Sequence, residues 1–334
     1  MTTRGPMTTR LLTACTVVLV AITATGCVRF TAPDSPPQRT TAITPTPPGM
    51  IVAKPGTALP PDSETDNCNR LASLRPIPLP EPGQMPPRTP MAEIYANGRL
   101  IVGVDTGSNP FSFRDPLSGD LRGFDVDLAR EISRAIFNDP NRIEFRVTRS
   151  ADRIRALQTG QVDLVVKTMS ITCERLKYVT FSSPYYVAAQ RILAVINSKI
   201  TSAANLKDKR VCVATGATSA LRLRRIVPSA TLVETATWAD CLVLMQQSGV
   251  DAVSTDDAIL AGLAAQDPWL HLVGPSLGEE YYGIGIRKDR DELVRFVNAV
   301  LVDLVATGRW RAIADEWLSV VGAPIALPRP TYRG

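Results

Sequence analysis

Histidine is almost absent from this chain: His271 is the only one among 334 residues. A metal site that needs two or more histidines is therefore excluded. Dense runs of lysine and arginine are also missing. The net charge of +5 falls to +3 (35 basic against 32 acidic residues) once Arg4 and Arg10, near the N-terminus, are set aside. This charge distribution does not indicate a nucleic-acid-binding protein.

Long apolar runs are missing too, apart from one run near the N-terminus. Two arginines precede an apolar stretch over residues 11–24, which is shorter than the roughly 20 residues that span a bilayer. This order is typical of an export signal, here over residues 1–26. The run ends Ala24-Thr-Gly-Cys27, which resembles a bacterial lipobox with an acylated cysteine. We expect an extracytoplasmic protein that is lipid-anchored to the cell membrane through Cys27; the alternative is a secretory signal with an incidental cysteine.

Four cysteines follow this position, an even number that suits an oxidising compartment. They can pair in three ways. Cys212 lies in a short apolar strand-like run and Cys241 in a helix-like stretch of the same half. We therefore favour Cys212–Cys241, which leaves Cys68–Cys173. The spacings do not resemble the paired C-x-x-C pattern of a zinc site, so we expect no metal.

Proline is concentrated in one segment, because residues 31–90 hold 16 of the 27 prolines. Such a segment cannot bury enough apolar surface to fold, so residues 27–90 are predicted to be an extended tether. Its end, residues 67–76, would pack on the body if the disulfide with Cys173 forms. The globular body follows over residues 91–327, and residues 328–334 form a tail.

Strand-like and helix-like segments alternate through this body. In its first half, strands are predicted at 100–105, 143–147 and 162–166, and helices from 124 onward and at 151–159. In its second half, strands are predicted at 211–214, 231–233 and 252–255, and helices at 218–226, 238–247 and 292–318. This alternation predicts an α/β fold with mostly parallel sheets covered by helices. Such sheets bind ligands at the carboxyl ends of their strands.

Hydroxyl and charged side chains follow the predicted strands. Thr218 and Ser219 begin a helix whose free amides and dipole favour an anion. Arg175 can hold a carboxylate with two hydrogen bonds, and Asp256 can hold an ammonium group. Together these groups suit a free α-amino acid. Each has a plainer alternative in isolation: a helix cap for Thr218 or Asp256, a surface ion pair for Arg175, and core packing for Phe111.

A set of motifs runs in order from Leu100 to Leu318. The principal one is Gly123-Phe-Asp-Val-Asp-Leu128; the others are Asn109-Pro-Phe111, Ala156-Leu-Gln-Thr-Gly160, Asp163, Ser170-Ile-Thr172 with Glu174-Arg175, Phe181-Ser182 with Tyr185-Tyr186, and Tyr282-Gly-Ile284. The set resembles bacterial extracellular solute-binding protein family 3, the polar amino acid-binding lipoproteins of ABC transporters. The resemblance implies a periplasmic-binding-protein (Venus-flytrap) fold with two hinge strands. Lobe 1 would be residues 91–189 plus 280–327, and lobe 2 residues 190–279.

The resemblance also implies how the backbone groups of the amino acid bind. The α-carboxylate would meet Ser170, Arg175 and the amide of Thr218. The α-ammonium group would meet Asp256 and the carbonyl oxygen of Thr168.

Residues around the ligand's side chain would set selectivity. Phe111 would pack on its aliphatic part. Arg153 is similar to an arginine of glutamate and aspartate binders that meets the side-chain carboxylate, helped here by Ser150, and Lys167 can add a second positive charge. Asp105 resembles instead the residue with which glutamine binders accept the side-chain amide, unless it pairs with Arg153 or Lys167. The implied ligands are glutamate and aspartate first, and glutamine and asparagine second.

The resulting hypothesis is a receptor and not an enzyme. It would use no cofactor, bind a free amino acid between closing lobes and present it to a membrane ABC permease or a membrane sensor. One alternative is an enzyme similar to the cyclohexadienyl dehydratases, which would need an acid to protonate a hydroxyl group; the positive charge of Arg153, Lys167 and Arg175 disfavours it. Two others are a glutamine-selective binder and an inert lipoprotein with a degenerate pocket.

Overall fold

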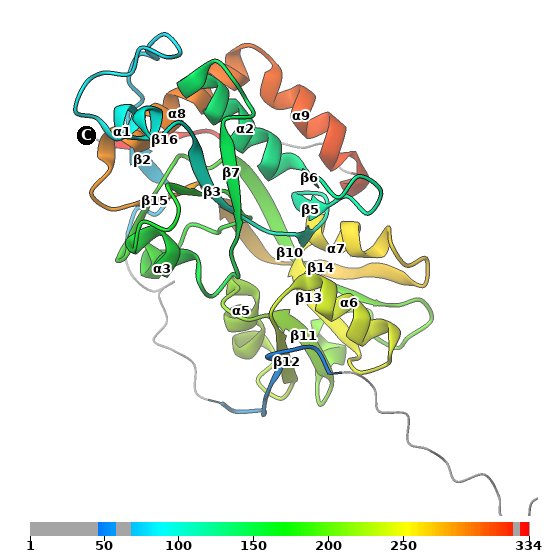
Figure 1. Cartoon of the computed structure of the whole chain (residues 1–334). Coiled ribbons are helices and arrows are strands. Elements are labelled where there is room, and N and C mark those ends of the chain that lie inside the picture. Colours follow the sequence, from blue (N-terminus) through cyan, green and yellow to red (C-terminus); the bar gives the residue numbers. More distant parts are fainter. Residues whose placement is uncertain (1–45, 58–67, 323–327, 334) are drawn as a thin grey trace, which may run out of the picture. The chain divides into compact units, whose positions relative to one another are not determined.

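The computed structural model describes residues 46–57, 68–322 and 328–333. The expected export signal, Cys27 and the first part of the expected tether lie outside the described residues. The described chain is α/β and has two lobes, each built on one main sheet (Figure 1). No helix in these ranges is both long and apolar enough to cross a bilayer.

Lobe 1 contains a five-stranded sheet in the order β7-β3-β8-β15-β9. Its strands are β3 (Leu100–Val104), β7 (Ile143–Val147), β8 (Leu164–Val165), β9 (Val179–Phe181) and β15 (Gly285–Arg287). Its helices are α1 (Pro90–Ala96), α2 (Phe124–Phe137), α3 (Arg153–Gln158), α4 (Cys173–Leu176), α8 (Asp291–Ala306) and α9 (Arg309–Leu318). A small sheet joins β4 (Gly107–Ser108), β5 (Ser112–Arg114) and β6 (Leu121–Arg122).

The helix α2 follows from the spacing of its apolar residues. Leu128, Ile132 and Ile136 recur every four residues and are fully buried in the core of lobe 1. Gly123, just before the helix, has φ +125°, and a Cβ there would lie 2.3 Å from the carbonyl oxygen of Phe111. Only glycine therefore allows the chain to pass Phe111 at this point.

Lobe 2 contains a six-stranded sheet in the order β1-β12-β11-β13-β10-β14. Its strands are β1 (Ile51–Ala53), β10 (Tyr186–Val195), β11 (Arg210–Ala214), β12 (Thr231–Thr235), β13 (Ala252–Asp256) and β14 (Leu270–Tyr282). Its helices are α5 (Thr218–Ile226), α6 (Trp238–Gln246), α7 (Asp257–Ala264) and a 3₁₀ turn (Ala203–Leu206). Both sheets are more mixed than the alternation of segments predicts. In each sheet three adjacent strands pair in parallel, and the remaining neighbours pair in antiparallel fashion.

Two long antiparallel strands, β10 and β14, connect the lobes. At one end Tyr186 pairs with Tyr282, and at the other Val195 pairs with Leu270. The lobe boundaries expected at 189/190 and 279/280 fall inside these two strands. A shift in register between Gln190 and Ile192 interrupts the ladder close to those boundaries.

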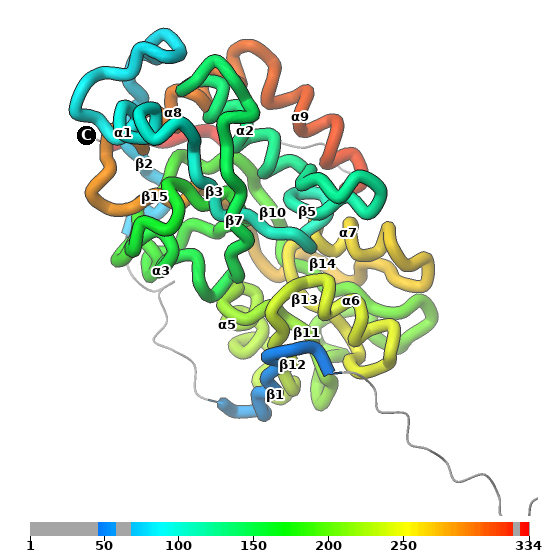
Figure 2. The backbone as a smooth tube through the Cα atoms, viewed as in Figure 1, coloured from blue at the N-terminus to red at the C-terminus, as the bar shows by residue number. Residues whose placement is uncertain are grey.

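The N-terminal tether and the C-terminal tail need a correction, since parts of both are ordered strands. β1 pairs with β12 at the edge of the lobe 2 sheet (Figure 2), although Ile51 and Val52 remain about half exposed. β2 (Ala72–Leu74) pairs in parallel with β16 (Thr331–Arg333) on lobe 1. Low apolar content predicts that such segments do not fold alone, but main-chain hydrogen bonding to a free sheet edge also orders a short segment.

Two disulfides are present, Cys68–Cys173 and Cys212–Cys241, and these are the pairings favoured by the sequence.

One expected helix is divided. The helical stretch predicted over 292–318 becomes α8 and α9, because Gly308 adopts φ +74° between them.

Candidate functional site

A pocket between the lobes gathers polar side chains from both. Seven of the ten predicted ligand-binding residues line it: Ser150, Arg153, Thr168, Ser170, Arg175, Thr218 and Asp256. Five further residues complete the lining: Ala217, Ser219, Trp238, Thr255 and Ile259. The carboxyl ends of β11 and β13 and the starts of α3, α5, α6 and α7 contribute to it, as expected for an α/β sheet.

Arg175 reaches the pocket from the one-turn helix α4. Its guanidinium donates to the carbonyl oxygens of Ser170 (2.7 Å) and, in lobe 2, of Gly216 (3.0 Å). The side chain is 8% exposed, and burial lowers its pKa. Within the described residues, both acceptors are neutral carbonyls, so this buried cation has no hydrogen-bonded counter-ion there.

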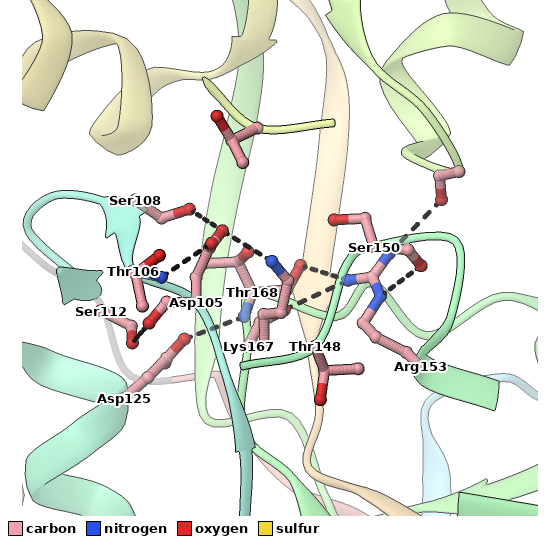
Figure 3. A network of polar contacts seen from close by, with 12 residues as sticks. Asp105, Thr106, Ser108, Ser112, Asp125, Thr148, Ser150, Arg153, Lys167 and Thr168 are labelled. Atoms are coloured by element: carbon pink, nitrogen blue, oxygen red, sulfur yellow. Dashed lines mark hydrogen bonds and ion pairs between the residues drawn. The ribbon is translucent and has the colours of Figure 1, made fainter. Parts of the chain in front are cut away.

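Arg153 is the first residue of α3 and is similarly placed. Its guanidinium donates to the carbonyl oxygens of Ser150 (2.9 Å), Lys167 (3.1 Å) and Gly216 (3.4 Å) (Figure 3). Burial, followed by the charge of Arg175, lowers the pKa of Arg153 to about 9. Two buried cations thus face one pocket with only carbonyl oxygens as hydrogen-bond acceptors in the described chain, an arrangement that favours an anionic ligand.

The N-terminus of α5 lies opposite these arginines. Thr218 Oγ1 lies 3.3 Å from Ser170 Oγ and donates to Glu280 Oε2 (3.1 Å). Ser219 Oγ is buried, lines the pocket and has no hydrogen-bond partner among the described residues. An unpartnered hydroxyl at a helix N-terminus is a ready donor for an anion. The neighbouring carboxylate of Glu280 is neutralised by Arg222, 2.7 Å away.

Asp256 provides a negative group on the same pocket. It occupies the position before α7, but its side chain makes no capping hydrogen bond. Instead it accepts a hydrogen bond from the Tyr282 hydroxyl. Burial, followed by the charge of Glu280, raises the pKa of Asp256 to about 7. The helix-cap alternative is therefore not realised by the side chain, and the carboxylate faces the pocket.

Thr168 is held in an unusual backbone conformation at the pocket wall. Its φ is +39°, which is rare for a β-branched residue. Its amide donates to Asp125 Oδ2 (2.9 Å) (Figure 3), and Tyr185 donates to the other oxygen of that carboxylate (2.8 Å). Asp125 is fully buried, and burial raises its pKa to about 7. The motif residue Asp125 thus supports the loop that carries Thr168.

Asp105 and Lys167 lie outside the pocket lining and pair with each other, with Lys167 Nζ 2.6 Å from Asp105 Oδ2 (Figure 3). Asp105 also accepts hydrogen bonds from Ser108 Oγ (2.5 Å) and the Thr106 amide (2.8 Å). Burial opposes ionisation of Asp105, but the charge and hydrogen bond of Lys167 lower its pKa overall. The sequence left Arg153 and Lys167 open as partners, and the structure selects Lys167.

Phe111 also lies outside the pocket lining. It is fully buried, and its ring packs edge-on against the rings of Phe124, Tyr186 and Tyr282, with centroids 5.2–6.0 Å apart. In this structure Phe111 belongs to an aromatic core beneath the hinge, which is the plainer alternative considered for it. The Phe111 ring therefore does not line the pocket in this structure, and its packing on the ligand stays a prediction.

Some lining residues were not among the candidates. Ser219 was named at the start of its predicted helix but was assigned to no group of the ligand. Thr255 ends the strand predicted at 252–255, so it could have been included among the residues at strand ends. Trp238 is the first residue of α6 and Ile259 lies in the first turn of α7. Their apolar side chains are typical of core residues. Their exposure to the pocket depends on the packing of α6 and α7, which periodicity does not reveal.

The charges around the pocket match a zwitterion with an additional negative charge. Two guanidinium groups and one carboxylate line the pocket, while Asp105–Lys167 and Glu280–Arg222 neutralise themselves as ion pairs. With Asp256 ionised, the lining carries a net charge of about +1. A ligand with two carboxylates and one ammonium group would match each of these charges.

Comparison with known proteins gives consistent matches over most of the body. The profile of the bacterial extracellular solute-binding proteins, family 3, matches residues 100–320. An ABC transporter glutamine-binding protein of Bacillus subtilis is 35% identical over 229 residues, which cover 68% of this chain and 84% of that protein. A glutamate-binding protein of Corynebacterium efficiens is 32% identical over 232 residues, which cover 66% of this chain and 79% of that protein.

Solved structures agree with the fold. The crystal structure of a solute receptor for L-cysteine from Neisseria gonorrhoeae superposes with a TM-score of 0.68 at 26% identity. The superposition covers 71% of this chain and 99% of that one. The similarity thus extends over nearly the whole of that receptor chain.

Proposed function

The chain belongs to family 3 of the bacterial extracellular solute-binding proteins, and on that premise we propose that it captures free glutamate or aspartate between its lobes. The observation that carries the proposal is the pair of buried guanidinium groups, Arg153 and Arg175, that line one pocket with carbonyl oxygens as their only hydrogen-bond acceptors in the described residues. A buried cation that is hydrogen-bonded only to neutral carbonyls is costly, and a dicarboxylate supplies two charged acceptors at once.

The ligand's α-carboxylate fits between Arg175 and the start of α5. Arg175 can donate two parallel hydrogen bonds to it, which is the strongest arrangement available to a carboxylate. Ser170, Thr218 and the unpartnered Ser219 hydroxyl line the same part of the pocket. The free amides and dipole of α5 add to the attraction.

The α-ammonium group fits against Asp256, the one carboxylate among the lining residues. The carbonyl oxygen of Thr168, which accepts a long hydrogen bond from Arg153 (3.5 Å), is a second acceptor on the opposite wall. Ligand ammonium and ionised Asp256 would form a charge-assisted hydrogen bond in a dry pocket, where such bonds are strong.

The side-chain carboxylate is assigned to Arg153, with Ser150 beside it. A glutamine-selective binder is the second candidate, favoured by the 35% identity to a glutamine-binding protein. Its expected amide acceptor, Asp105, is engaged by Lys167, Ser108 and the Thr106 amide and lies behind the lining. This engagement supports the acidic ligands over the amides.

Binding of one ligand by both lobes would favour the closed arrangement by population shift. The protein would then present the amino acid to a membrane ABC permease or to a membrane sensor. Anchoring through an acylated Cys27 would hold it at the cell membrane, because the chain between residue 27 and the body then acts as a tether.

A ligand screen tests the proposal. Residues 44–334, which form one compact unit, would be heated with each of the twenty amino acids. Ligand at about 100 times its dissociation constant stabilises the folded state by about 2.7 kcal/mol, which raises the melting temperature visibly. Larger shifts with glutamate and aspartate than with glutamine and asparagine are expected. A shift with glutamine alone would overturn the acidic preference, and no shift with any amino acid would overturn the function.

A further inference from the structure

The one-turn helix α4 carries both a pocket residue and a disulfide. Cys173 is its first residue and is bonded to Cys68, and Arg175 is its third residue. We propose that the Cys68–Cys173 disulfide positions Arg175 by fixing the start of α4, and thereby holds the guanidinium that receives the ligand's α-carboxylate. This inference rests on the proposed function, which makes Arg175 the carboxylate anchor.

A helix of four residues needs support from outside itself. Helices shorter than about 12 residues are marginal in isolation because nucleation is costly. Within α4, Thr172 Oγ1 accepts a hydrogen bond from the Arg175 amide (3.2 Å), and Leu176 is only partly buried. The bond to Cys68 is a covalent tie at the residue where the helix begins.

The other end of this tie is itself fixed. Cys68 leads into β2, which pairs with β16. Ser73 Oγ donates to the carbonyl oxygen of Phe181 (2.9 Å), and the fully buried Asn298 donates to Ser73 Oγ (2.8 Å) and to the Leu74 carbonyl oxygen (2.7 Å). The disulfide therefore joins α4 to a strand that is held on lobe 1, so it restrains the helix.

The two disulfides differ in accessibility. Cys68 is exposed, whereas Cys212 and Cys241 are both fully buried. Because exchange requires attack on an accessible sulfur, we expect a thiolate reagent to reduce the disulfide of Cys68 in the folded protein and to leave the second disulfide intact. This difference makes the Cys212–Cys241 bond an internal control.

The reagent would be the dithiol dithiothreitol. One thiolate of the reagent attacks Cys68 Sγ, the disulfide breaks, and Cys173 leaves as a thiolate that takes up a proton. The second thiolate of the reagent then closes to a cyclic disulfide and releases Cys68, which is also protonated. The protein disulfide is thus reduced to two thiols while the dithiol is oxidised.

The first measurement uses no ligand. A soluble form without the expected signal and Cys27, residues 28–334, is reduced and alkylated, and peptide mass analysis checks that only Cys68 and Cys173 are labelled. Hydrogen–deuterium exchange then follows the amides of Leu176, Lys177 and Tyr178, whose hydrogen bonds close α4. We expect faster exchange in this segment and unchanged exchange in α5, which contains no cysteine.

The second measurement is titration calorimetry with glutamate and with glutamine, before and after reduction. Displacement of the anchor is expected to raise the dissociation constant by about tenfold for both ligands, a typical size for a coupled neighbour. Their ratio should stay constant, because Arg175 binds the group that all amino acids share. A variant with Cys68→Ser and Cys173→Ser repeats the comparison without reagent, and reduced wild type replaces it if that variant does not fold.

An Arg175→Lys background separates positioning from general stability. If the disulfide acts through Arg175, reduction should weaken binding less in Arg175→Lys than in wild type. Equal losses in both backgrounds, or unchanged exchange and affinity on reduction, would overturn the proposal. If exchange in α4 rises but the oxidised protein binds no amino acid, positioning of Arg175 is supported while the proposed function fails.

Discussion

Arg153 and Arg175 both donate to the carbonyl oxygen of Gly216, at 3.4 and 3.0 Å, although they belong to different helices of lobe 1. The two like charges are close enough that Arg175 contributes to the lowered pKa of Arg153. Gly216 lies in the loop that precedes α5 in lobe 2. A single carbonyl oxygen of lobe 2 thus accepts hydrogen bonds from both guanidinium groups of lobe 1. A dicarboxylate would be a stronger acceptor for both.

Replacing Arg175 tests the shared anchor. The substitution Arg175→Ala should weaken binding of every amino acid by more than about tenfold, or roughly 1.4 kcal/mol, because it removes the donor to the common α-carboxylate. Titration calorimetry with glutamate, aspartate and glutamine would measure it. Affinities that stay within about tenfold of wild type would contradict the assignment.

Replacing Arg153 tests selectivity. The substitution Arg153→Met should reduce binding of glutamate and aspartate while sparing glutamine and asparagine, because only the acidic ligands need a counter-ion for the side chain. The matched control is Arg155→Met, two residues further along α3, whose side chain is 68% exposed and pairs with Asp152. Competition calorimetry gives the ratio of affinities. An equal loss for all four ligands in Arg153→Met would identify Arg153 as structural.

The order and type of most elements could be predicted from the sequence. Period and turn signals gave β7 (Ile143–Val147) and α5 (Thr218–Ile226) with their observed bounds. The pairing of β1 could not be predicted, because Ile51 and Val52 stay largely exposed and the strand is held by main-chain hydrogen bonds to β12. Hydrophobic patterning detects burial and is insensitive to such pairing.

The predicted site residues also fall into two groups, those that line the pocket and those that do not. Asp256 ends β13 and Arg175 lies in the one-turn helix α4, and both line the pocket because topology brings strand ends and helix starts together. Phe111 and Asp105 also follow a strand, but their side chains turn into an aromatic core and a buried ion pair. Side-chain direction beyond a strand end depends on loop conformation, which sequence period does not encode.

The buried pair of Asp105 and Lys167 should be more costly to break than to remove. Lys167→Met leaves an uncompensated carboxylate, so the free energy of unfolding should fall by about 3–5 kcal/mol. Asp105→Asn combined with Lys167→Met should cost clearly less, since neither charge remains. Urea denaturation of both variants measures the difference. A double variant as unstable as Lys167→Met alone would show that the pair's charges do not determine the cost.

The stability of the ligand-free protein should fall as pH rises from about 4 toward 8. Burial raises the pKa of both Asp125 and Asp256 to about 7, above the ordinary value of 3.8 that applies to the unfolded chain. The folded state therefore binds more protons between these values, and its stability is lost as these groups ionise. Denaturation midpoints measured across this range check the sign. Asp125→Asn should flatten the dependence, and an unchanged slope in that variant would remove Asp125 from the explanation.

Ligand affinity should depend on pH in the opposite sense. The ligand's ammonium group needs ionised Asp256, whose pKa burial and the charge of Glu280 raise to about 7; Tyr282, Arg222 and Asp257 are the other charged or titratable neighbours. The ionised fraction rises from about one tenth at pH 6 to about nine tenths at pH 8, so the apparent affinity should increase by about tenfold. Calorimetry with glutamate at both pH values measures this ratio. The Glu280→Gln variant removes one of the charges that raise the pKa, so its affinity should vary less over the same range. A wild-type affinity that is constant or falls from pH 6 to pH 8 would mean that Asp256 does not hold the ammonium group.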